Sequence, residues 1–287
     1  MSARALQLPM LKDALRDLLS EQEIRSLSSS FDVIGDIAII KVPTELSSKE
    51  KLIAGQIIEK MKSVRTVLRQ DSSVGGEFRI RAVSCIGGDE KYETLYKESG
   101  LLFKVNVKSA YFSPRLSTER LRIRALVSDN ERIFNMFAGI GTFSLIIAKT
   151  KNCVIESIDK NPEAIRLAFD SLKLNKKLKG TVHPILADAK EFASQNAGLF
   201  DRILMPLPER VDEFLPFAVI SARRDKRSVI HYYCHVPEDK FRESGWIQRH
   251  LEEQEIERRF DVSTWKRVRE VGPRLIQAVA DIELEPV

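Results

Sequence analysis

Residues 133–141 read Ile133-Phe134-Asn135-Met136-Phe137-Ala138-Gly139-Ile140-Gly141, and an apolar run follows them. This pattern predicts a buried strand, a tight glycine turn and the start of a helix. The two glycines allow backbone to approach a ligand closely, because a Cβ at either position would block it. A helix that starts at such a turn points N–H groups at that ligand. Since the third glycine of a dinucleotide fingerprint is absent, the turn alone does not identify the ligand.

Polar side chains end the strands predicted next to this turn. Asp159 ends the predicted strand 154–159, 18 residues after Gly141, where a carboxylate can accept hydrogen bonds from a ribose diol. Asp188 follows the predicted strand 182–186, where it can accept from an adenine amino group. Asn135 ends the first strand, where a methionine ammonium group would need an acceptor. Each could be an ordinary turn residue, but together they favour S-adenosylmethionine over a nicotinamide cofactor.

Strand and helix patterns alternate from about residue 110 to the C-terminus, which is typical of a parallel sheet. The last two predicted strands, 262–271 and 274–284, would pair antiparallel. The fold class is therefore α/β, similar to the Rossmann-like seven-stranded sheet of class I methyltransferases. Residues 31–109 predict a smaller N-terminal α+β domain, with a helix at 47–64 and strands at 37–42, 66–68, 78–83 and 101–107. We expect residues 1–30 to form a short helical segment, in which Ser20 and Glu23 have the spacing of a capping box, and residues 110–287 to form the catalytic domain.

The composition agrees with an intracellular enzyme. The 287 residues carry a net charge of +5, which suits a polyanionic partner but equally suits ordinary solvated lysines and arginines. Cys85, Cys153 and Cys234 lie far apart without disulfide or metal-ligand spacing, so we expect a reducing compartment and no metal. The first twenty residues mix charged with apolar side chains, so neither a signal peptide nor a membrane span is expected there.

Several longer stretches resemble the archaeal and eukaryotic tRNA (guanine-N1)-methyltransferases over most of the chain from Phe31 onward. The stretches that carry the resemblance are Phe31-Asp32-Val33-Ile34-Gly35-Asp36-Ile37-Ala38-Ile39-Ile40, Gly76-Glu77-Phe78-Arg79, Tyr111-Phe112-Ser113-Pro114-Arg115-Leu116-Ser117-Thr118-Glu119-Arg120, Met136-Phe137-Ala138-Gly139-Ile140-Gly141 and Leu207-Pro208. The resemblance implies methylation of the guanosine 3′ of the tRNA anticodon, position 37, by a cytoplasmic monomer that binds the anticodon stem-loop. It also implies that an N-terminal domain for the tRNA elbow is missing here.

The resemblance implies a role for individual residues. Glu119 matches the general base that removes the N1 proton, and Arg79 matches the arginine that contacts O6, where negative charge builds. Arg120 and Tyr111 match residues that hold the base or its loop. The residues expected to bind the cofactor are Asn135, Phe137, Ala138, Gly139, Gly141, Asp159, Lys160, Asp188, Ala189, Pro206, Leu207 and Pro208.

The sequence departs from the family at two of these positions. Asn135 replaces an aspartate, so an ammonium partner loses its counter-charge, and Pro206 replaces an asparagine, which removes a polar contact. A sister family with the same architecture transfers the aminocarboxypropyl group of S-adenosylmethionine during wybutosine synthesis. Its members lack the Leu-Pro pair that this chain has after the fourth strand, at Leu207-Pro208. A non-catalytic RNA-binding relative is the third alternative.

Structural roles are also open for four of the singled-out features. Glu119 could favour a helix N-terminus that Ser117 or Thr118 caps. Arg79 could lie on the wet face of a strand. His231 and His235 would share one face of a strand, where packing is a better interpretation than metal binding, and residues 223–227 predict a solvated loop.

Overall fold

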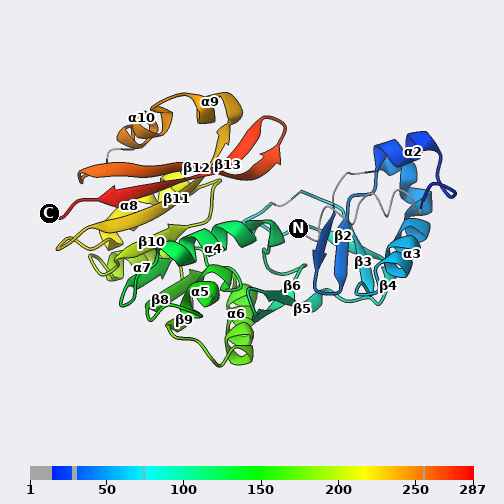
Figure 1. Cartoon of the computed structure of the whole chain (residues 1–287), viewed down its shortest axis with the longest axis horizontal. Helices are drawn as coiled ribbons and strands as arrows, with labels where there is room; N and C mark the ends of the chain where they lie inside the picture. The colour runs from blue at the N-terminus through cyan, green and yellow to red at the C-terminus, as the bar shows by residue number, and fades with distance from the viewer. Residues whose placement is uncertain (1–14, 28–30, 74, 255) are drawn as a thin grey trace. The chain divides into compact units, whose positions relative to one another are not determined.

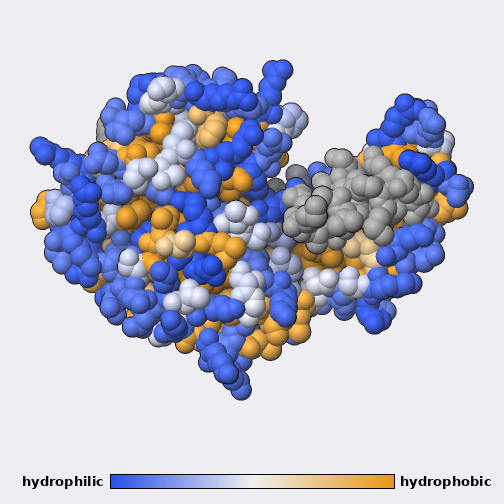
Figure 2. Space-filling view, viewed as in Figure 1, coloured by the Kyte–Doolittle hydropathy of each residue, from blue (hydrophilic) through white to orange (hydrophobic). Residues whose placement is uncertain are grey.

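The structure is a computed structural model that describes residues 15–27, 31–73, 75–254 and 256–287. The chain divides into two compact units, residues 1–114 and 115–287, and each is described by itself below. Hydrophilic side chains cover most of the face seen in Figure 2, with apolar patches between them. Among the described residues, no helix is both long enough and apolar enough to cross a membrane.

The first unit contains a four-stranded sheet and a hairpin (Figure 1). The sheet has the order β1-β2-β3-β4, and its strands are β1 (Asp32–Ile34), β2 (Ile37–Ile40), β3 (Thr66–Gln70) and β4 (Val83–Gly88). Strands β2 and β3 are parallel, and the 3-10 helix η1 (Thr44–Lys49) and helix α3 (Glu50–Lys60) connect them. Helix α3 buries Ile53 and Ile57 in the same core as Ala38 and Val67. Strands β5 (Glu93–Glu98) and β6 (Leu101–Asn106) form the hairpin.

The N-terminal helical prediction is confirmed where the structure describes it. Helix α2 (Glu21–Ser26) begins after Ser20, whose hydroxyl accepts from the backbone N–H of Glu23. The Glu23 carboxylate in turn accepts from the backbone N–H of Ser20 at 2.8 Å, which completes the predicted capping box. Residues 1–14 and 28–30 of the predicted helical segment lie outside the described residues.

The predicted strand at 78–83 is wrong. Residues 76–79 form a turn between Gly75 and Ile80, and strand β4 begins only at Val83. Arg79 closes this turn in the left-handed region with φ +54°, and its N–H donates to the Gly76 carbonyl at 3.1 Å. The Gly75-Gly76 turn therefore continues further than the alternation of apolar and basic residues suggested. Arg79 does not lie on the wet face of a strand.

The second unit is built on a seven-stranded sheet, as predicted. Its order is β12-β13-β11-β10-β7-β8-β9, with the five strands from β11 to β9 parallel and β13 and β12 antiparallel. The strands are β7 (Arg132–Asn135), β8 (Val154–Asp159), β9 (Thr181–Leu186), β10 (Arg202–Met205), β11 (Ser228–Pro237), β12 (Phe260–Gly272) and β13 (Leu275–Leu284).

Helices cover this sheet in two layers (Figure 1). One layer contains α4 (Ser117–Leu126), α5 (Thr142–Ala148) and α6 (Pro162–Leu174); the other contains α7 (Ala189–Gln195), α8 (Val211–Ser221), α9 (Glu238–Arg242) and α10 (Trp246–Glu252). Helices α9 and α10 are both short and follow one another closely along the chain. Gly245 separates them with φ +72°, a conformation that a side chain would strain.

Two glycines of the first unit are expected to respond oppositely to alanine. A Cβ on Gly88, at φ +78°, would lie 1.9 Å from the Arg65 carbonyl oxygen, so Gly88→Ala should lower the free energy of unfolding by at least about 2 kcal/mol. Gly55 lies in helix α3, and a Cβ there would meet nothing within 4 Å, so Gly55→Ala should raise that free energy by roughly 0.5–1 kcal/mol. Urea unfolding followed by circular dichroism measures both. Equal effects of the two substitutions would contradict the turn geometry at Gly88.

Candidate active site

The glycine turn after β7 is fixed to the end of β8. Gly139 and Gly141 have φ of +54° and +78°, which L side chains rarely adopt. The backbone N–H of Gly139 donates to Oδ2 of Asp159 at 2.7 Å, and that of Ala138 donates to the Ile158 carbonyl at 2.8 Å. Helix α5 begins directly after Gly141, with Gly141 as its N-cap residue. The predicted strand, turn and helix are confirmed.

Asp159 connects two turns with its two oxygens. Oδ1 accepts from the backbone N–H of Asn161 at 2.9 Å, while Oδ2 takes the Gly139 amide. Burial raises the pKa of this carboxyl, although the amides that it binds oppose the shift. Each carboxylate oxygen has two lone pairs. The amides therefore leave acceptor capacity for a ribose diol at the end of β8.

Asn135 presents a buried acceptor at the end of β7. Its side chain is fully buried, and Nδ2 donates to Oγ of Ser144 at 3.1 Å. Ser144 Oγ lies 2.7 Å from Ser157 Oγ on the neighbouring strand. No described residue donates a hydrogen bond to Oδ1 of Asn135, which is unusual for a buried oxygen. An ammonium or other N–H donor of a ligand fits this oxygen.

The remaining predicted cofactor residues follow β8, β9 and β10. Asp188 caps helix α7 through Oδ1, which accepts from Lys190 N at 2.8 Å, and its Oδ2 lies 3.7 Å from Lys160 Nζ. Ala189, the first residue of that helix, is buried. Asp188 therefore places a charged side chain just beyond the carboxyl end of β9.

Residues 206–208 form the turn after β10. Leu207 packs against the main core of the second unit, and its N–H donates to the Met205 carbonyl at 2.9 Å. Phe137 packs edge-on against Phe214, with ring centroids 4.8 Å apart. Both Leu207 and Phe137 are half-buried, so apolar surface remains beside the glycine turn.

Glu119 is buried in the first turn of helix α4. The N-cap residue of helix α4 is Leu116, and no side chain caps this helix. The alternative of a Ser117 or Thr118 cap is therefore wrong. Only 5 % of Glu119 is exposed. Its carboxylate accepts from the Tyr233 hydroxyl at 2.8 Å and from the Arg122 guanidinium at 2.7–3.0 Å.

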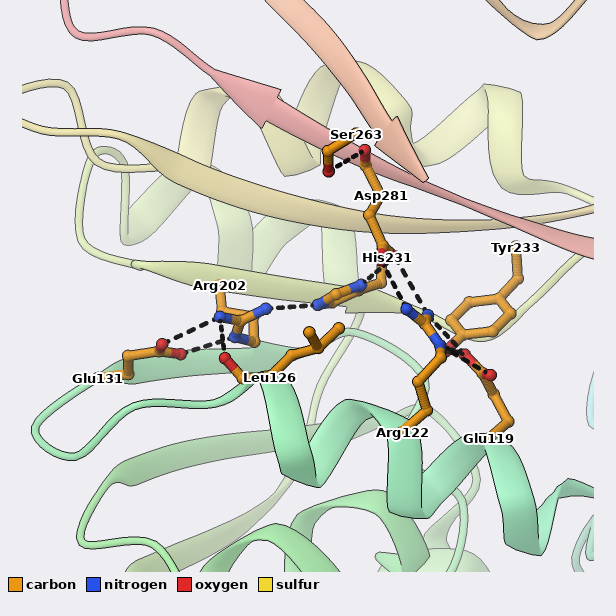
Figure 3. Close-up of polar contacts among 9 residues, drawn as sticks. All are labelled: Glu119, Arg122, Leu126, Glu131, Arg202, His231, Tyr233, Ser263 and Asp281. Carbon is orange, nitrogen blue, oxygen red and sulfur yellow. Dashed lines mark hydrogen bonds and ion pairs between the residues drawn. The ribbon is translucent and has the colours of Figure 1, made fainter. Parts of the chain in front are cut away.

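A chain of ion pairs and hydrogen bonds continues from Arg122 (Figure 3). Arg122 donates through Nη1 and Nη2 to the two oxygens of Asp281, at 2.6 and 3.1 Å. Oδ1 of Asp281 lies 2.6 Å from Nδ1 of His231, and Nε2 of His231 lies 2.7 Å from Nη1 of Arg202. The Arg202 guanidinium then binds the Glu131 carboxylate at 2.7 and 3.0 Å. We call these residues the Glu119 network.

The network fixes the protonation of its histidine. A guanidinium only donates, so Nε2 of His231 must accept from Arg202 and Nδ1–H must donate to Asp281. The imidazole is therefore neutral, and burial lowers the pKa of His231 despite the adjacent Asp281. The predicted packing role of His231 is confirmed, since it is fully buried and hydrogen-bonded on both sides.

The pKa values of three other groups of the network are also shifted. Asp281 and Arg122 stay charged as a result, and Tyr233 stays neutral. Burial alone would raise the pKa of Asp281, but hydrogen bonds from His231 and Arg122 outweigh it and hold this pKa well below its usual range. Burial opposes the charge of Arg122, yet Glu119 and Asp281 raise its pKa. Burial and the Glu119 carboxylate both raise the pKa of Tyr233, so its hydroxyl stays protonated and donates.

Arg79 and Tyr111 lie together in the first unit. The Arg79 guanidinium carbon is 4.3 Å from the centroid of the Tyr111 ring, a cation–π contact that orients the arginine. Arg120 lies next to Glu119 on helix α4 and is only 1 % exposed. An arginine is almost never buried so fully unless its charge is paired.

Sequence reasoning missed the residues that hold Glu119, both directly and through Arg122. Arg122 lies three residues after Glu119, the spacing of neighbours on one helix face, and this signal was available. Tyr233 and Asp281 come from strands β11 and β13, far away in the sequence. No local pattern connects those residues with Glu119.

The sheet and the strand ends define a class I S-adenosylmethionine-dependent methyltransferase. A family model described as "TRM5/TYW2 methyltransferase domain" matches residues 94–262, and one described as "TYW2 N-terminal domain" matches residues 11–91. The chain belongs to the TRM5/TYW2 methyltransferase family, which confirms the predicted resemblance.

Three relatives illustrate the similarity. The tRNA (guanine(37)-N(1))-methyltransferase Trm5b of Pyrococcus abyssi is 41% identical over 262 residues, 90% of this chain and 74% of that protein. Its crystal structure has a TM-score of 0.81 at 36% identity, covering 95% of this chain and 80% of that one. The structure of aTrm5 with tRNALeu has a TM-score of 0.79 at 30% identity, covering 94% and 76%. Pyrococcus horikoshii TYW2 in complex with MeSAdo has a TM-score of 0.76 at 25% identity, covering 97% and 99%.

Asp159 is expected to control cofactor affinity. Asp159→Ala removes the anchor of the Gly139 amide and the carboxylate expected to accept from the ribose diol, so the Kd for S-adenosylmethionine should rise at least about tenfold. Isothermal titration calorimetry measures this Kd. Asp170→Ala, on the outer surface of helix α6, is the matched control and should leave it unchanged. A Kd for Asp159→Ala within twofold of the unsubstituted protein would reduce Asp159 to a turn residue.

Proposed function

We propose that this protein transfers the methyl group of S-adenosylmethionine to N1 of the guanosine immediately 3′ of the anticodon, position 37, in tRNA. The observation that carries the proposal is the Glu119 carboxylate, which is buried and accepts hydrogen bonds from Arg122 and Tyr233. Membership of the TRM5/TYW2 family and the relative Trm5b, named for this reaction, support it.

The chemistry requires a base at the Watson–Crick edge of the purine. Guanine N1 carries a proton at neutral pH, so it is a poor nucleophile until that proton leaves. Glu119 accepts the proton in the proposed mechanism, and a positioned base of this kind contributes about 10²–10⁴ to the rate. The bound cofactor supplies an electrophilic methyl group. Because Glu119 is buried, proton donors of the bulk water do not compete with guanine N1 for its carboxylate.

The cofactor is proposed to lie along the carboxyl ends of β7–β10. In this proposal Asn135 accepts from the methionine ammonium through its buried Oδ1, Asp159 binds the ribose diol and Asp188 accepts from the adenine amino group. The other proposed contacts are Phe137, Ala138, Gly139, Gly141, Lys160, Ala189, Pro206, Leu207 and Pro208. The amide of Asn135 is neutral, so it offers the methionine ammonium no negative charge. We therefore expect weaker cofactor binding than an aspartate at this position would give.

Three further residues have proposed roles toward the guanine and the tRNA. Arg79, oriented by Tyr111, donates to guanine O6, where charge builds as N1 loses its proton. Arg120 holds the base or its loop. The α+β domain of residues 31–109 contacts the anticodon stem-loop, and residues 110–287 form the catalytic domain of a cytoplasmic monomer.

Aminocarboxypropyl transfer is the second candidate. The match of residues 11–91 to the TYW2 N-terminal domain favours it, while Leu207-Pro208 after β10 favours methyl transfer. Mass spectrometry of tRNA incubated with the protein and S-adenosylmethionine separates the two, because the adducts differ in mass. An aminocarboxypropyl adduct would replace the proposal.

Glu119→Gln is expected to abolish most methyl transfer. The amide keeps the shape of the side chain but cannot accept the N1 proton, so the single-turnover rate should fall by about 10²–10⁴. The Kd for S-adenosylmethionine should stay within about twofold, because no bond to the cofactor changes. The rate is measured by transfer of labelled methyl to a tRNA transcript with guanosine at position 37, and a transcript with adenosine there is the control. A Glu119→Gln rate equal to that of the unsubstituted protein would remove the base assignment.

Arg79→Ala is expected to slow the reaction more than it weakens tRNA binding. Loss of the O6 contact acts on the charge that develops during proton removal, so the single-turnover rate at saturating tRNA should fall about 10²-fold. Filter binding at several salt concentrations measures the tRNA Kd. If only a salt-sensitive Kd changed while the saturated rate held, Arg79 would be a phosphate contact instead.

A further inference from the structure

We infer that Arg122 and Asp281 are positioning residues that direct one oxygen, Oε2 of Glu119, toward the proton it removes. The inference rests on the proposed function, in which Glu119 is the base. It adds an atom to that role and two residues that act only through Glu119. None of the sequence motifs that indicated the active site includes either residue.

The two oxygens of Glu119 have unequal surroundings. Oε1 accepts from the Tyr233 hydroxyl at 2.8 Å and from Arg122 Nη2 at 2.7 Å, and the single Nε–H of Arg122 is shared between Oε1 and Oε2, at 3.0 Å from each. Among the described residues, Oε2 accepts only from Arg122 Nε, at 3.0 Å. A carboxylate offers about four lone-pair positions, two on each oxygen. Oε1 is therefore saturated, and Oε2 keeps the lone pair that can take a proton.

Arg122 is itself held from the opposite side. Its guanidinium is planar and donates in a rigid fork, so the bonds to Asp281 at 2.6 and 3.1 Å fix the plane from which Nε and Nη2 reach Glu119. Arg122 therefore sets the orientation of the Glu119 carboxylate as well as binding it. A lysine in its place would carry the charge without the fork.

Asp281 is a second carboxylate paired with the guanidinium that binds Glu119. Two carboxylates share one guanidinium, so the group of Glu119, Arg122 and Asp281 keeps a net charge of −1 with each group ionised. The neutral His231 donates to Asp281 without adding a positive charge, and it holds that carboxylate in place.

The far end of the network anchors the near end. Arg202 binds Nε2 of His231, the Glu131 carboxylate and the Leu126 carbonyl at the end of helix α4 (Figure 3). The network therefore crosses from strands β10, β11 and β13 to both ends of the helix that carries Glu119. With both ends fixed, the helix can hold a carboxylate oxygen within the tolerance that proton transfer demands.

Three substitutions test the inference by single-turnover methyl transfer at saturating tRNA and cofactor. Arg122→Lys and Asp281→Asn, made in the whole chain, should each lower the rate at least about tenfold, with the Kd values for tRNA and cofactor within threefold. In a Glu119→Gln background, Arg122→Lys should lower the residual rate less than twofold, because it acts through the group already removed. Arg124→Lys on the same helix, outside the network, is the matched control and should keep the full rate.

The outcomes separate this inference from the function on which it rests. Circular dichroism and thermal unfolding confirm that each variant is folded; if Arg122→Lys does not fold, Asp281→Asn, which has the same shape as the original residue, decides. Rates within threefold of the unsubstituted protein in folded Arg122→Lys and Asp281→Asn would overturn the inference, as would full additivity with Glu119→Gln. Full activity of Glu119→Gln alone would instead overturn the base assignment.

Discussion

One guanidinium, that of Arg122, holds two carboxylates inside the second unit. Glu119 and Asp281 are 5 % and 4 % exposed, and burying charges of this kind is unfavourable unless every one is paired. Removing one member of such a group typically costs about 3–5 kcal/mol, because a buried charge is left without its partner. The helix that carries Glu119 is therefore tied to the sheet by charge as well as by packing, and its carboxylate has little freedom to turn toward water.

The order of the strands makes this arrangement possible. Strand β13 lies antiparallel to β11, and their register places Asp281 directly opposite His231. Directly opposed residues of an antiparallel pair bring their side chains together on one face of the sheet. Tyr233, two residues after His231 along β11, points to that same face and reaches Glu119. An entirely parallel edge would not supply this pairing, so the reversed final strand contributes to the site as well as to the core.

Local features of the sequence were predictable and distant ones were not. The glycine turn, the capping box at Ser20 and the polar strand ends depend on neighbouring residues, so their patterns indicated the structure correctly. The strand predicted at 78–83 failed, because alternating apolar and basic residues do not reveal that Arg79 adopts a left-handed conformation. Tyr233 on strand β11, which binds Glu119, and Asp281 on strand β13, which binds Arg122, lie more than a hundred positions away, and only the folded sheet brings them to helix α4.

The most direct measurement is the structure of the complex with an anticodon stem-loop and S-adenosylhomocysteine. The account predicts that N1 of the guanine at position 37 lies about 3 Å from Oε2 of Glu119, within hydrogen-bond distance. Oε1 should then keep its bonds to Tyr233 and Arg122. A complex in which the guanine edge meets another acceptor, while both oxygens of Glu119 stay bound to protein groups alone, would contradict it.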